Sequence, residues 1–504
     1  MKIDIKNLPT NVTLLHQIIA DLATEVDWLQ SKLNLLRAKH FGKSSEKLDN
    51  EIADIELRIE EAESLGKIVT TVEDPSENEN EKQQPKRQKL PEQLPREQII
   101  LEAPTVCSGC GGKDFRKISD DKSEMLEYVP SSFKVVQYVR PRCACVACDK
   151  IIQAYPPSNP ISKGKAGSGL LAHILIQKYC NHLPFYRQSQ IYEREGIELS
   201  RSTMSSWAGQ CATLLEPLIG KLKESIFASS QIHGDDTPVR VLAPGLGKTK
   251  TGRIWAYVRD GRPHSDTTPP AVCYFYSPDR KGERPREHLK DFTGILHADA
   301  YSGYDKLYGD NITEAACWAH TRRKFYEITV ASDNAKVAYA TLEKISEIYK
   351  IEEGIKGFDP KKRQEARQES SKKLVDDLFT SFKAALTKLP KKSATTLAIN
   401  YAMNNQAALM RFLDNGKIEI DNNAAERAMR SIALGRKNWL FAGSDNGGQT
   451  VATIYSLVET AKLNKINPQI YLSKVLSVIQ DHKSTKLAEL LPWNIVIPDA
   501  VASG

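Results

Sequence analysis

Long apolar runs, a strong charge of one sign and cysteine are all scarce in this sequence. No run of roughly eighteen apolar residues, the length that spans a membrane, occurs in the chain. The first residues, MKIDIKNLPTNV, lack the apolar core of a signal peptide. A net charge of +7 over 504 residues permits a nucleic-acid partner without requiring one. We therefore expect a cytoplasmic protein without a membrane partner, and its length predicts several domains.

Cysteine accounts for nine residues, and four of these form two C-x-x-C pairs, at 107–110 and 145–148. These cysteines suit a reducing compartment and a bound metal better than a disulfide framework. The pairs flank a strand-like segment, 131–142, as in a tetrahedral structural zinc site closed by four thiolates. Cys143 is a competing thiol, and the alternative is a set of unliganded buried cysteines. The zinc ligands that we predict are Cys107, Cys110, Cys145 and Cys148.

The N-terminal part predicts a helical element followed by a linker. Residues 15–36 repeat apolar side chains at alternating spacings of four and three, a heptad seam of about three repeats, and a second seam follows at 48–59. Such seams serve either an intramolecular hairpin or dimerisation, and the sequence leaves both open. Residues 70–96 are polar and contain proline, so we expect a flexible linker. Its basic PKRQK stretch is either solvated or in contact with DNA phosphates.

Residues 183–211 predict two helices joined by a short turn at Gly196, with Ser200 as the N-cap of the second helix. In a helix-turn-helix, the start of the second helix enters the major groove of DNA. The alternative is an ordinary helical pair that packs on the next domain. Small polar and basic side chains suit phosphate and base-edge contacts, and the candidates here are Arg201, Ser202 and Thr203.

Between residues 228 and 320 the chain becomes rich in predicted strands. The candidates are 231–242, 252–260, 271–278, 293–301 and 314–320, with a short helix at 285–292. This order predicts a ribonuclease-H-like α/β fold, in which metal-binding acids lie on the first strand and at the end of the fourth. Asp235 and Asp299 occupy those two places, each predicted to end its strand. Asp236 would point to the opposite face of an extended strand, so it is the second choice.

A helix expected at 421–434 supplies a third acid, Glu426. Asp421 or Asn422 can cap this helix, and Gly435 can end it. The alternative role for Glu426 is an exposed ion pair with the arginine four residues later, worth a few tenths of a kcal/mol. Two aspartates and a glutamate can instead hold two divalent ions at a phosphodiester bond. Hard oxygen ligands favour Mg²⁺ or Mn²⁺ over Zn²⁺ there.

Basic segments surround these acids. Residues 244–253 resemble the end of a phosphate-binding loop, but a Walker motif would need glycine in place of Leu242, so we interpret the segment as a basic hairpin tip. His320 is either a histidine at the end of the fifth strand or a hydrogen-bond donor to the scissile phosphate. Residues 435–448 combine basic, aromatic and glycine residues, as in a loop close to a nucleic-acid backbone. The predicted DNA contacts here are His320, Lys248, Lys250, Arg253, Arg322, Arg323, Lys324, Arg427, Arg430, Arg436 and Lys437.

The order of these motifs resembles that of bacterial transposases of the insertion sequence 66 family, in the DDE superfamily. The resemblance runs almost from end to end and includes FGKSSEK, HLPFYRQ, HGDDTP, ADAYSGYDKLY, CWAHTRRKF, DNNAAERAMR and LLPWN. It implies that Asp235, Asp299 and Glu426 are the catalytic triad. It also implies that the helical stretch 325–413 is an insertion that precedes Glu426. Asp236 departs from the family, in which glutamate is common at this position.

Together these features predict a multidomain α+β protein that cleaves DNA and transfers strands with Mg²⁺ (or Mn²⁺) at the catalytic site and structural Zn²⁺. Its partners would be double-stranded DNA (the terminal repeats of a mobile element and target DNA), further copies of itself on DNA, and small accessory proteins of the same element. A catalytically silent DNA-binding regulator and a nuclease without joining activity are the alternatives. We expect it in the bacterial cytoplasm, associated with the nucleoid when bound to DNA. The expected parts are a coiled coil or helical hairpin (1–66), a flexible linker (67–98), a zinc-binding β module (99–155), a helix-turn-helix-like region (160–225), a ribonuclease-H-like domain (226–450) and C-terminal helices (451–504).

Overall fold

The computed structural model describes residues 133–138, 142–144, 151–153, 158–161, 164–243, 248–309, 311–331 and 335–496. Residues 133–153 and 158–495 belong to two separate units. In the first, strand β1 (Arg142–Ala144) pairs antiparallel with β2 (Ile151–Gln153). The strand predicted at 131–142 is wrong over 133–138, which form no strand. The heptad seams, the linker and the four predicted zinc ligands lie outside the described residues.

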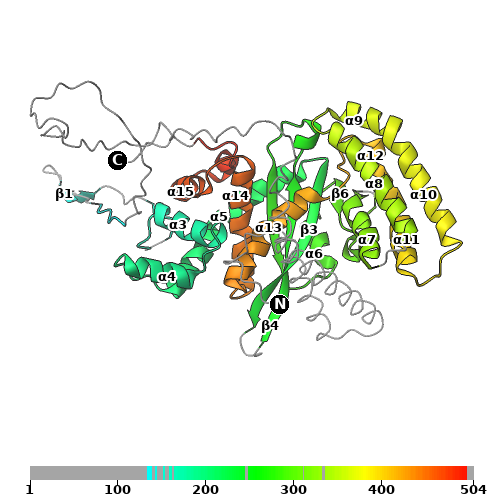
Figure 1. Ribbon diagram of the computed structural model, residues 1–504. Helices are drawn as coiled ribbons and strands as arrows, with labels where there is room; N and C mark the ends of the chain where they lie inside the picture. The colour runs from blue at the N-terminus through cyan, green and yellow to red at the C-terminus, as the bar shows by residue number, and fades with distance from the viewer. Residues whose placement is uncertain are drawn as a thin grey trace, which may run out of the picture. The chain divides into compact units, whose positions relative to one another are not determined.

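The larger unit is built on a five-stranded sheet with the order β5-β4-β3-β6-β7 (Figure 1). The first three strands in sequence are antiparallel, whereas β6 is parallel to both β3 and β7. All five strands occur where the sequence predicts them, but the last two end earlier than predicted, at Ala298 and at Ala316. The fifth strand ends early because the CWAH segment turns into a helix. The bounds are β3 (Gln231–Ala243), β4 (Lys248–Arg259), β5 (Ala271–Ser277), β6 (Gly294–Ala298) and β7 (Ile312–Ala316).

Helix α14 (Asp445–Leu463) protects the β5 edge of the sheet. The Ser456 hydroxyl accepts a hydrogen bond from the Tyr274 amide over 2.8 Å. The Thr460 hydroxyl accepts from the Val272 amide over 3.1 Å and donates to its carbonyl over 3.0 Å. These hydroxyls satisfy backbone groups that an edge strand would otherwise leave open.

The helices before the sheet include the predicted pair. Helix α4 (Phe185–Arg194) is followed by Gly196, whose φ of 78° is in the left-handed region, and then by α5 (Arg201–Phe227). The Ser200 hydroxyl accepts a hydrogen bond from the Thr203 amide over 3.1 Å, which confirms the predicted N-cap. Helix α5 packs on β5 and α14. The remaining elements outside the insertion are α3 (Ser168–Tyr179), η2 (Arg262–His264), α6 (Glu283–His288), η3 (Ser302–Tyr304), α15 (Pro468–Val478) and η5 (Ser484–Leu490).

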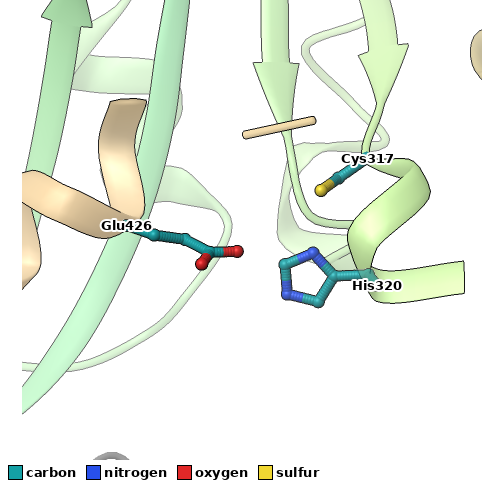
Figure 2. A group of neighbouring side chains, drawn as sticks. All are labelled: Cys317, His320 and Glu426. Atoms are coloured by element: carbon teal, nitrogen blue, oxygen red, sulfur yellow. The ribbon is translucent and has the colours of Figure 1, made fainter. Parts of the chain in front are cut away.

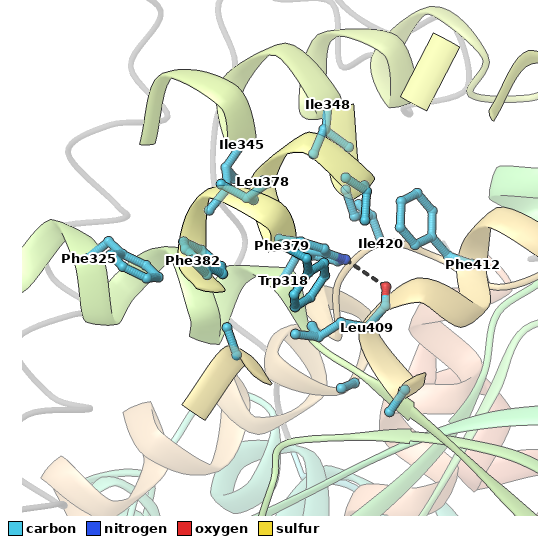
Figure 3. Close-up of a cluster of buried hydrophobic side chains, with 14 of the residues drawn as sticks. Trp318, Phe325, Ile345, Ile348, Leu378, Phe379, Phe382, Leu409, Phe412 and Ile420 are labelled. Atoms are coloured by element: carbon cyan, nitrogen blue, oxygen red, sulfur yellow. Dashed lines mark hydrogen bonds between the residues drawn. The ribbon is translucent and has the colours of Figure 1, made fainter. Parts of the chain in front are cut away.

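Between β7 and α13 (Asn423–Trp439) the described residues are helical, as predicted for 325–413. Aromatic rings fill the core of this subdomain, where the Trp318 indole nitrogen donates to the Leu409 carbonyl over 2.8 Å (Figure 3). This bond fixes the start of the subdomain against its end. The elements are α7 (Trp318–Ala331), α8 (Lys336–Gly354), α9 (Pro360–Ala366), the π-helical turn η4 (Arg367–Ser371), α10 (Lys372–Leu386), α11 (Ala394–Asn404) and α12 (Gln406–Asp414).

Helix α13 does not end at Gly435, so that prediction is wrong. A Cβ atom at Gly435 would lie 2.6 Å from the indole nitrogen of Trp439 and 2.7 Å from the hydroxyl oxygen of Tyr455. The glycine is therefore required for close packing inside the helix, which ends at Trp439 and is followed by Leu440 with a φ of 59°. The loop predicted at 435–448 is correspondingly shorter, since α14 begins at Asp445. None of the helices in the described part of the chain is long and apolar enough to cross a membrane.

Candidate active site

Asp235 and Asp299 come from neighbouring parallel strands. His233 of β3 pairs with His297 of β6, and their rings stack with centroids 5.1 Å apart. Each aspartate lies two residues beyond its histidine, so both lie at the edge where the pairing of β3 with β6 ends. Asp299 follows β6 directly, as predicted. Asp235 does not end its strand, because β3 continues with β4 as a two-stranded arm to Ala243.

Glu426 lies on a helix that covers the same face of the sheet as Asp235. Asp235 pairs with Ala256 of β4, which pairs with Tyr274 of β5, and such cross-strand neighbours share a face. The Tyr274 hydroxyl donates a hydrogen bond to the Ala428 carbonyl of α13 over 2.7 Å. Glu426 is in the first turn of this helix, where the helix dipole favours a negative charge.

Asn422 joins the start of α13 to the strand that carries Asp235. Its side-chain nitrogen donates to the Gly234 carbonyl over 2.8 Å, and its side-chain oxygen lies 3.1 Å from Nδ1 of His233. Its backbone N–H donates to the Cys317 thiol over 3.2 Å. Of the two predicted capping residues, Asn422 does not cap the helix with its side chain. Asp421 instead accepts a hydrogen bond from a backbone N–H at the helix start. This buried side chain is therefore a clamp between the two elements.

Asp236 points away from that face and belongs to a buried ion-pair cluster. Its carboxylate lies 3.3 Å from the guanidinium of Arg253 and 3.0 Å from that of Arg280. Arg280 also lies 3.9 Å from Asp299, so it joins the cluster to the candidate site. Arg280 was not among the predicted site residues. Its position in a basic segment directly after the third strand was the available signal.

Glu426 has two further neighbours at the junction of β7 and α7. One ligand atom each of Cys317, His320 and Glu426 lie within 4.8 Å of one another, and Asp235 and Asp299 do not belong to this group. Figure 2 shows the Cys317 thiol and the His320 ring on the same side of the junction as the Glu426 carboxylate. His320 is in the first turn of α7, so the strand-end position predicted for it is wrong. Cys317 was not predicted as a site residue, although its C-x-x-H spacing to His320 was visible.

Burial shapes the acidity of these groups. Desolvation raises the pKa of Asp299, although the charges of Arg280 and His320 oppose this rise. Desolvation lowers the pKa of His320 and raises the pKa of Cys317 to about 12. Within the described ranges, Oδ1 of Asp299 and Nδ1 of His320 are buried and have no hydrogen-bond partner. The site therefore contains oxygen and nitrogen atoms that a cation could use.

The predicted DNA-contacting side chains differ in exposure. Arg253 and Arg436 are only 7% and 2% exposed, and Arg436 hydrogen-bonds the Thr237 hydroxyl, so burial removes both from the predicted set. Lys250 forms an ion pair with Asp445 over 2.6 Å and is partly exposed. The remaining predicted residues are all exposed or partly exposed: Arg201, Ser202, Thr203, Lys248, His320, Arg322, Arg323, Lys324, Arg427, Arg430 and Lys437.

Comparisons with known proteins agree with this architecture. The sequence model described as "Transposase IS66 family" matches residues 163–450, and the "IS66 C-terminal element" matches 456–493. The "zinc-finger binding domain of transposase IS66" matches 104–149, and the "Transposase C of IS166 homeodomain" matches 28–99. These matches define a DNA-binding protein of the transposase class with a zinc-finger domain.

Similar proteins occur in Sinorhizobium fredii. The uncharacterized protein y4hP is 36% identical over 487 residues, which cover 92% of this chain and 88% of that protein. The uncharacterized protein y4qI is 36% identical over 485 residues, which cover 94% of this chain and 89% of that protein. The chain belongs to the IS66 family of transposases.

Proposed function

We propose that this transposase cleaves DNA at the ends of its mobile element and transfers the freed strand to target DNA, with Asp235, Asp299 and Glu426 as catalytic acids. The observation that carries this proposal is the position of the three acids, which lie at one edge and over one face of the sheet. Two aspartates follow a stacked histidine pair on parallel strands, and the helix of Glu426 covers the face of Asp235. The strand order β5-β4-β3-β6-β7 supports a ribonuclease-H-like catalytic domain.

The three acids suit Mg²⁺ or Mn²⁺, because hard cations prefer carboxylate oxygens. The buried Oδ1 of Asp299 has no hydrogen-bond partner among the described residues, which fits a metal ligand. Two such ions, when bound, would stabilise the charge that develops on the attacking and leaving oxygens of the phosphodiester. The Glu426 carboxylate also belongs to a group with Cys317 and His320.

The other predicted contacts would hold DNA around this site. Lys248 and Lys250 lie on the arm formed by β3 and β4, and Arg201 lies at the start of α5. Such side chains neutralise phosphates and make DNA affinity depend on salt. The start of α5 would enter the major groove as the second helix of a helix-turn-helix. The four thiolates at 107–110 and 145–148 would bind Zn²⁺ and fold the small module. Further copies of the chain and small accessory proteins would complete the assembly on DNA in the bacterial cytoplasm.

A strand-joining assay tests the proposal. Purified full-length protein, its element ends with a labelled 3′ terminus, a target plasmid and Mg²⁺ should yield labelled target DNA. A nuclease without joining activity would nick the ends and leave the target unlabelled. A silent regulator would shift the ends in a gel without nicking them. Either of these two outcomes would overturn the proposal.

A further inference from the structure

We propose that Cys317, His320 and Glu426 form a second metal site, selective for Zn²⁺ over Mg²⁺. While occupied, this site would keep Glu426 from the two aspartates and so inhibit the transposase. The inhibitory role rests on the proposed function, whereas the metal binding does not. This site is distinct from the predicted four-cysteine zinc site, which shares none of these residues.

The three side chains come from two parts of the chain, the junction of β7 with α7 and the start of α13. Cys317 and His320 lie at the junction of β7 and α7, and Glu426 approaches from the first turn of α13 (Figure 2). Their ligand atoms lie within 4.8 Å of one another. Zn–S and Zn–N bonds of about 2.0–2.3 Å in a tetrahedron require ligand atoms about 3.5 Å apart. Side-chain rotations that move these atoms by about 1 Å would therefore close the site.

The chemistry of the donors decides which ion fits. One thiolate, one imidazole and one carboxylate are all ligands of Zn²⁺, which accepts three protein ligands and an open fourth position. Mg²⁺ prefers oxygen ligands and near-ideal octahedral geometry, so sulfur and nitrogen discriminate against it. The mixed donor set therefore favours Zn²⁺ by its composition.

The surroundings hold the ligands in place before any ion binds. The Cys317 sulfur accepts hydrogen bonds from the backbone N–H groups of Asn422, over 3.2 Å, and His320. In metal sites, hydrogen bonds of this kind hold the ligand side chains in their orientation. Nδ1 of His320 is buried and has no hydrogen-bond partner in the described part of the chain.

Trp318 fixes the turn that carries both ligands. It lies between Cys317 and His320 in the sequence and is fully buried. Its backbone N–H donates to the Ile420 carbonyl over 3.1 Å, and its indole nitrogen donates to the Leu409 carbonyl over 2.8 Å. These bonds anchor the turn to the helical insertion and to the segment before α13.

The shared carboxylate makes the two sites competitors. An ion held by Cys317 and His320 takes an oxygen of Glu426, which the proposed magnesium site also needs. Removing Glu426 from Asp235 and Asp299 would leave that site with two acids. Zn²⁺ would therefore inhibit strand joining, and a higher Mg²⁺ concentration would raise the Zn²⁺ concentration needed for half inhibition.

Co²⁺ binding tests the site without reference to activity. Full-length protein is first loaded with one equivalent of Zn²⁺ to fill the four-cysteine site, and Co²⁺ is then titrated while thiolate-to-cobalt absorption is recorded. Wild-type protein should bind one further equivalent. Cys317→Ser, whose hydroxyl can still accept the two N–H bonds, should lose the band, and His320→Ala should bind at least about tenfold more weakly.

Cys180→Ser is the matched control. Cys180 is a free cysteine that hydrogen-bonds with Lys462 and lies outside the cluster, so this variant should keep the wild-type band. Circular dichroism establishes that each variant is folded. A wild-type protein without the band, or a folded Cys317→Ser variant with the wild-type band, would overturn the metal site.

Inhibition by Zn²⁺ tests the regulatory part. Strand joining is measured at fixed Mg²⁺ with increasing Zn²⁺, and each variant is compared with its own rate without added Zn²⁺. Cys317→Ser should need at least about tenfold more Zn²⁺ for half inhibition than wild type or Cys180→Ser. Equal sensitivity would overturn the inhibitory role. If wild type binds Co²⁺ as expected but joins no DNA, the proposed function fails and the metal site stands.

Discussion

The side-chain amide of Asn422 donates a hydrogen bond to the carbonyl oxygen of Gly234 over 2.8 Å. This bond connects the residue before the helix of Glu426 to the peptide unit that precedes Asp235. Asn422 is only 1% exposed, so water cannot replace its partners when the side chain is removed. One asparagine thus holds two of the three proposed catalytic acids in a defined relation.

Replacing Asn422 should therefore impair both the fold and the reaction. We expect Asn422→Ala to lower the free energy of unfolding by about 1–3 kcal/mol, because it leaves the Gly234 carbonyl and the His233 ring without their partner. Strand joining should fall as well. Urea unfolding measures the first effect. Asn423→Ala is the control, since its partly exposed side chain donates a hydrogen bond to Asp421 at the helix start and does not contact Gly234 or His233. Equal losses in the two variants would contradict the clamp.

Substitutions of the adjacent residues Asp235 and Asp236 should have different effects on protein stability. Asp236→Ala leaves the guanidinium of Arg253 buried without its carboxylate, and we expect a loss of stability of about 3 kcal/mol. Asp235→Asn should leave the unfolding midpoint close to that of wild type and abolish strand joining. Thermal unfolding and the joining assay together separate these effects. A destabilised Asp235→Asn, or a stable Asp236→Ala, would show that the two roles are assigned wrongly.

Two helical glycines should differ sharply when changed to alanine. Gly435→Ala forces a methyl group against Trp439 and Tyr455, and overpacking of this kind costs about 1–3 kcal/mol. Gly209 of α5 has open space around its Cβ position, so Gly209→Ala should stabilise the protein by up to about 1 kcal/mol. Denaturant midpoints of the two variants check the pair. Loss of stability in both variants would contradict the open space around the Cβ position of Gly209 in α5.

His288 should make stability depend on pH. Burial, with smaller effects of Lys223 and Arg284, lowers the pKa of His288 from 6.5 to about 3. Between these values the unfolded chain binds a proton that the folded protein does not. The stability from this group is complete above pH 6.5 and falls as the pH drops toward 3, by at most about 1.4 kcal/mol per pH unit.

Urea unfolding between pH 7 and pH 4.5 measures this dependence. His288→Gln should show a shallower slope than wild type, because its side chain does not titrate. The slope should not vanish, since burial also lowers the pKa of His233 and His297. An unchanged slope in His288→Gln would exclude the buried neutral histidine.

The sequence predicted local structure well where patterning is local. The five strands and the α4–α5 pair follow from apolar runs, Gly196 and the Ser200 cap, all of which act within a few residues. Gly435 was misinterpreted because its reason for being glycine is Tyr455, twenty residues later in the sequence. His320 was placed on a strand because CWAH is apolar, whereas the helix start depends on contacts with Ile420 and Leu409.

The candidate site was predictable only in part, for the same reason. The acids could be proposed from strand ends and a helix start. The clamp at Asn422 and the arginines around Asp236 could not, because they join residues 188 and 44 positions apart. Arg253 and Arg436 carry charges that suggest DNA, but their burial depends on tertiary partners that the sequence does not reveal.

Strand joining by Asp299→Asn tests the central claim most directly. The substitution removes one negative charge at the end of β6 and keeps the size of the side chain. Asp305→Asn, an exposed position six residues later, is the matched control. We expect Asp299→Asn to bind labelled element ends as wild type does and to join none of them to the target with Mg²⁺, while Asp305→Asn joins them at the wild-type rate. Joining by Asp299→Asn at the wild-type rate would contradict the account.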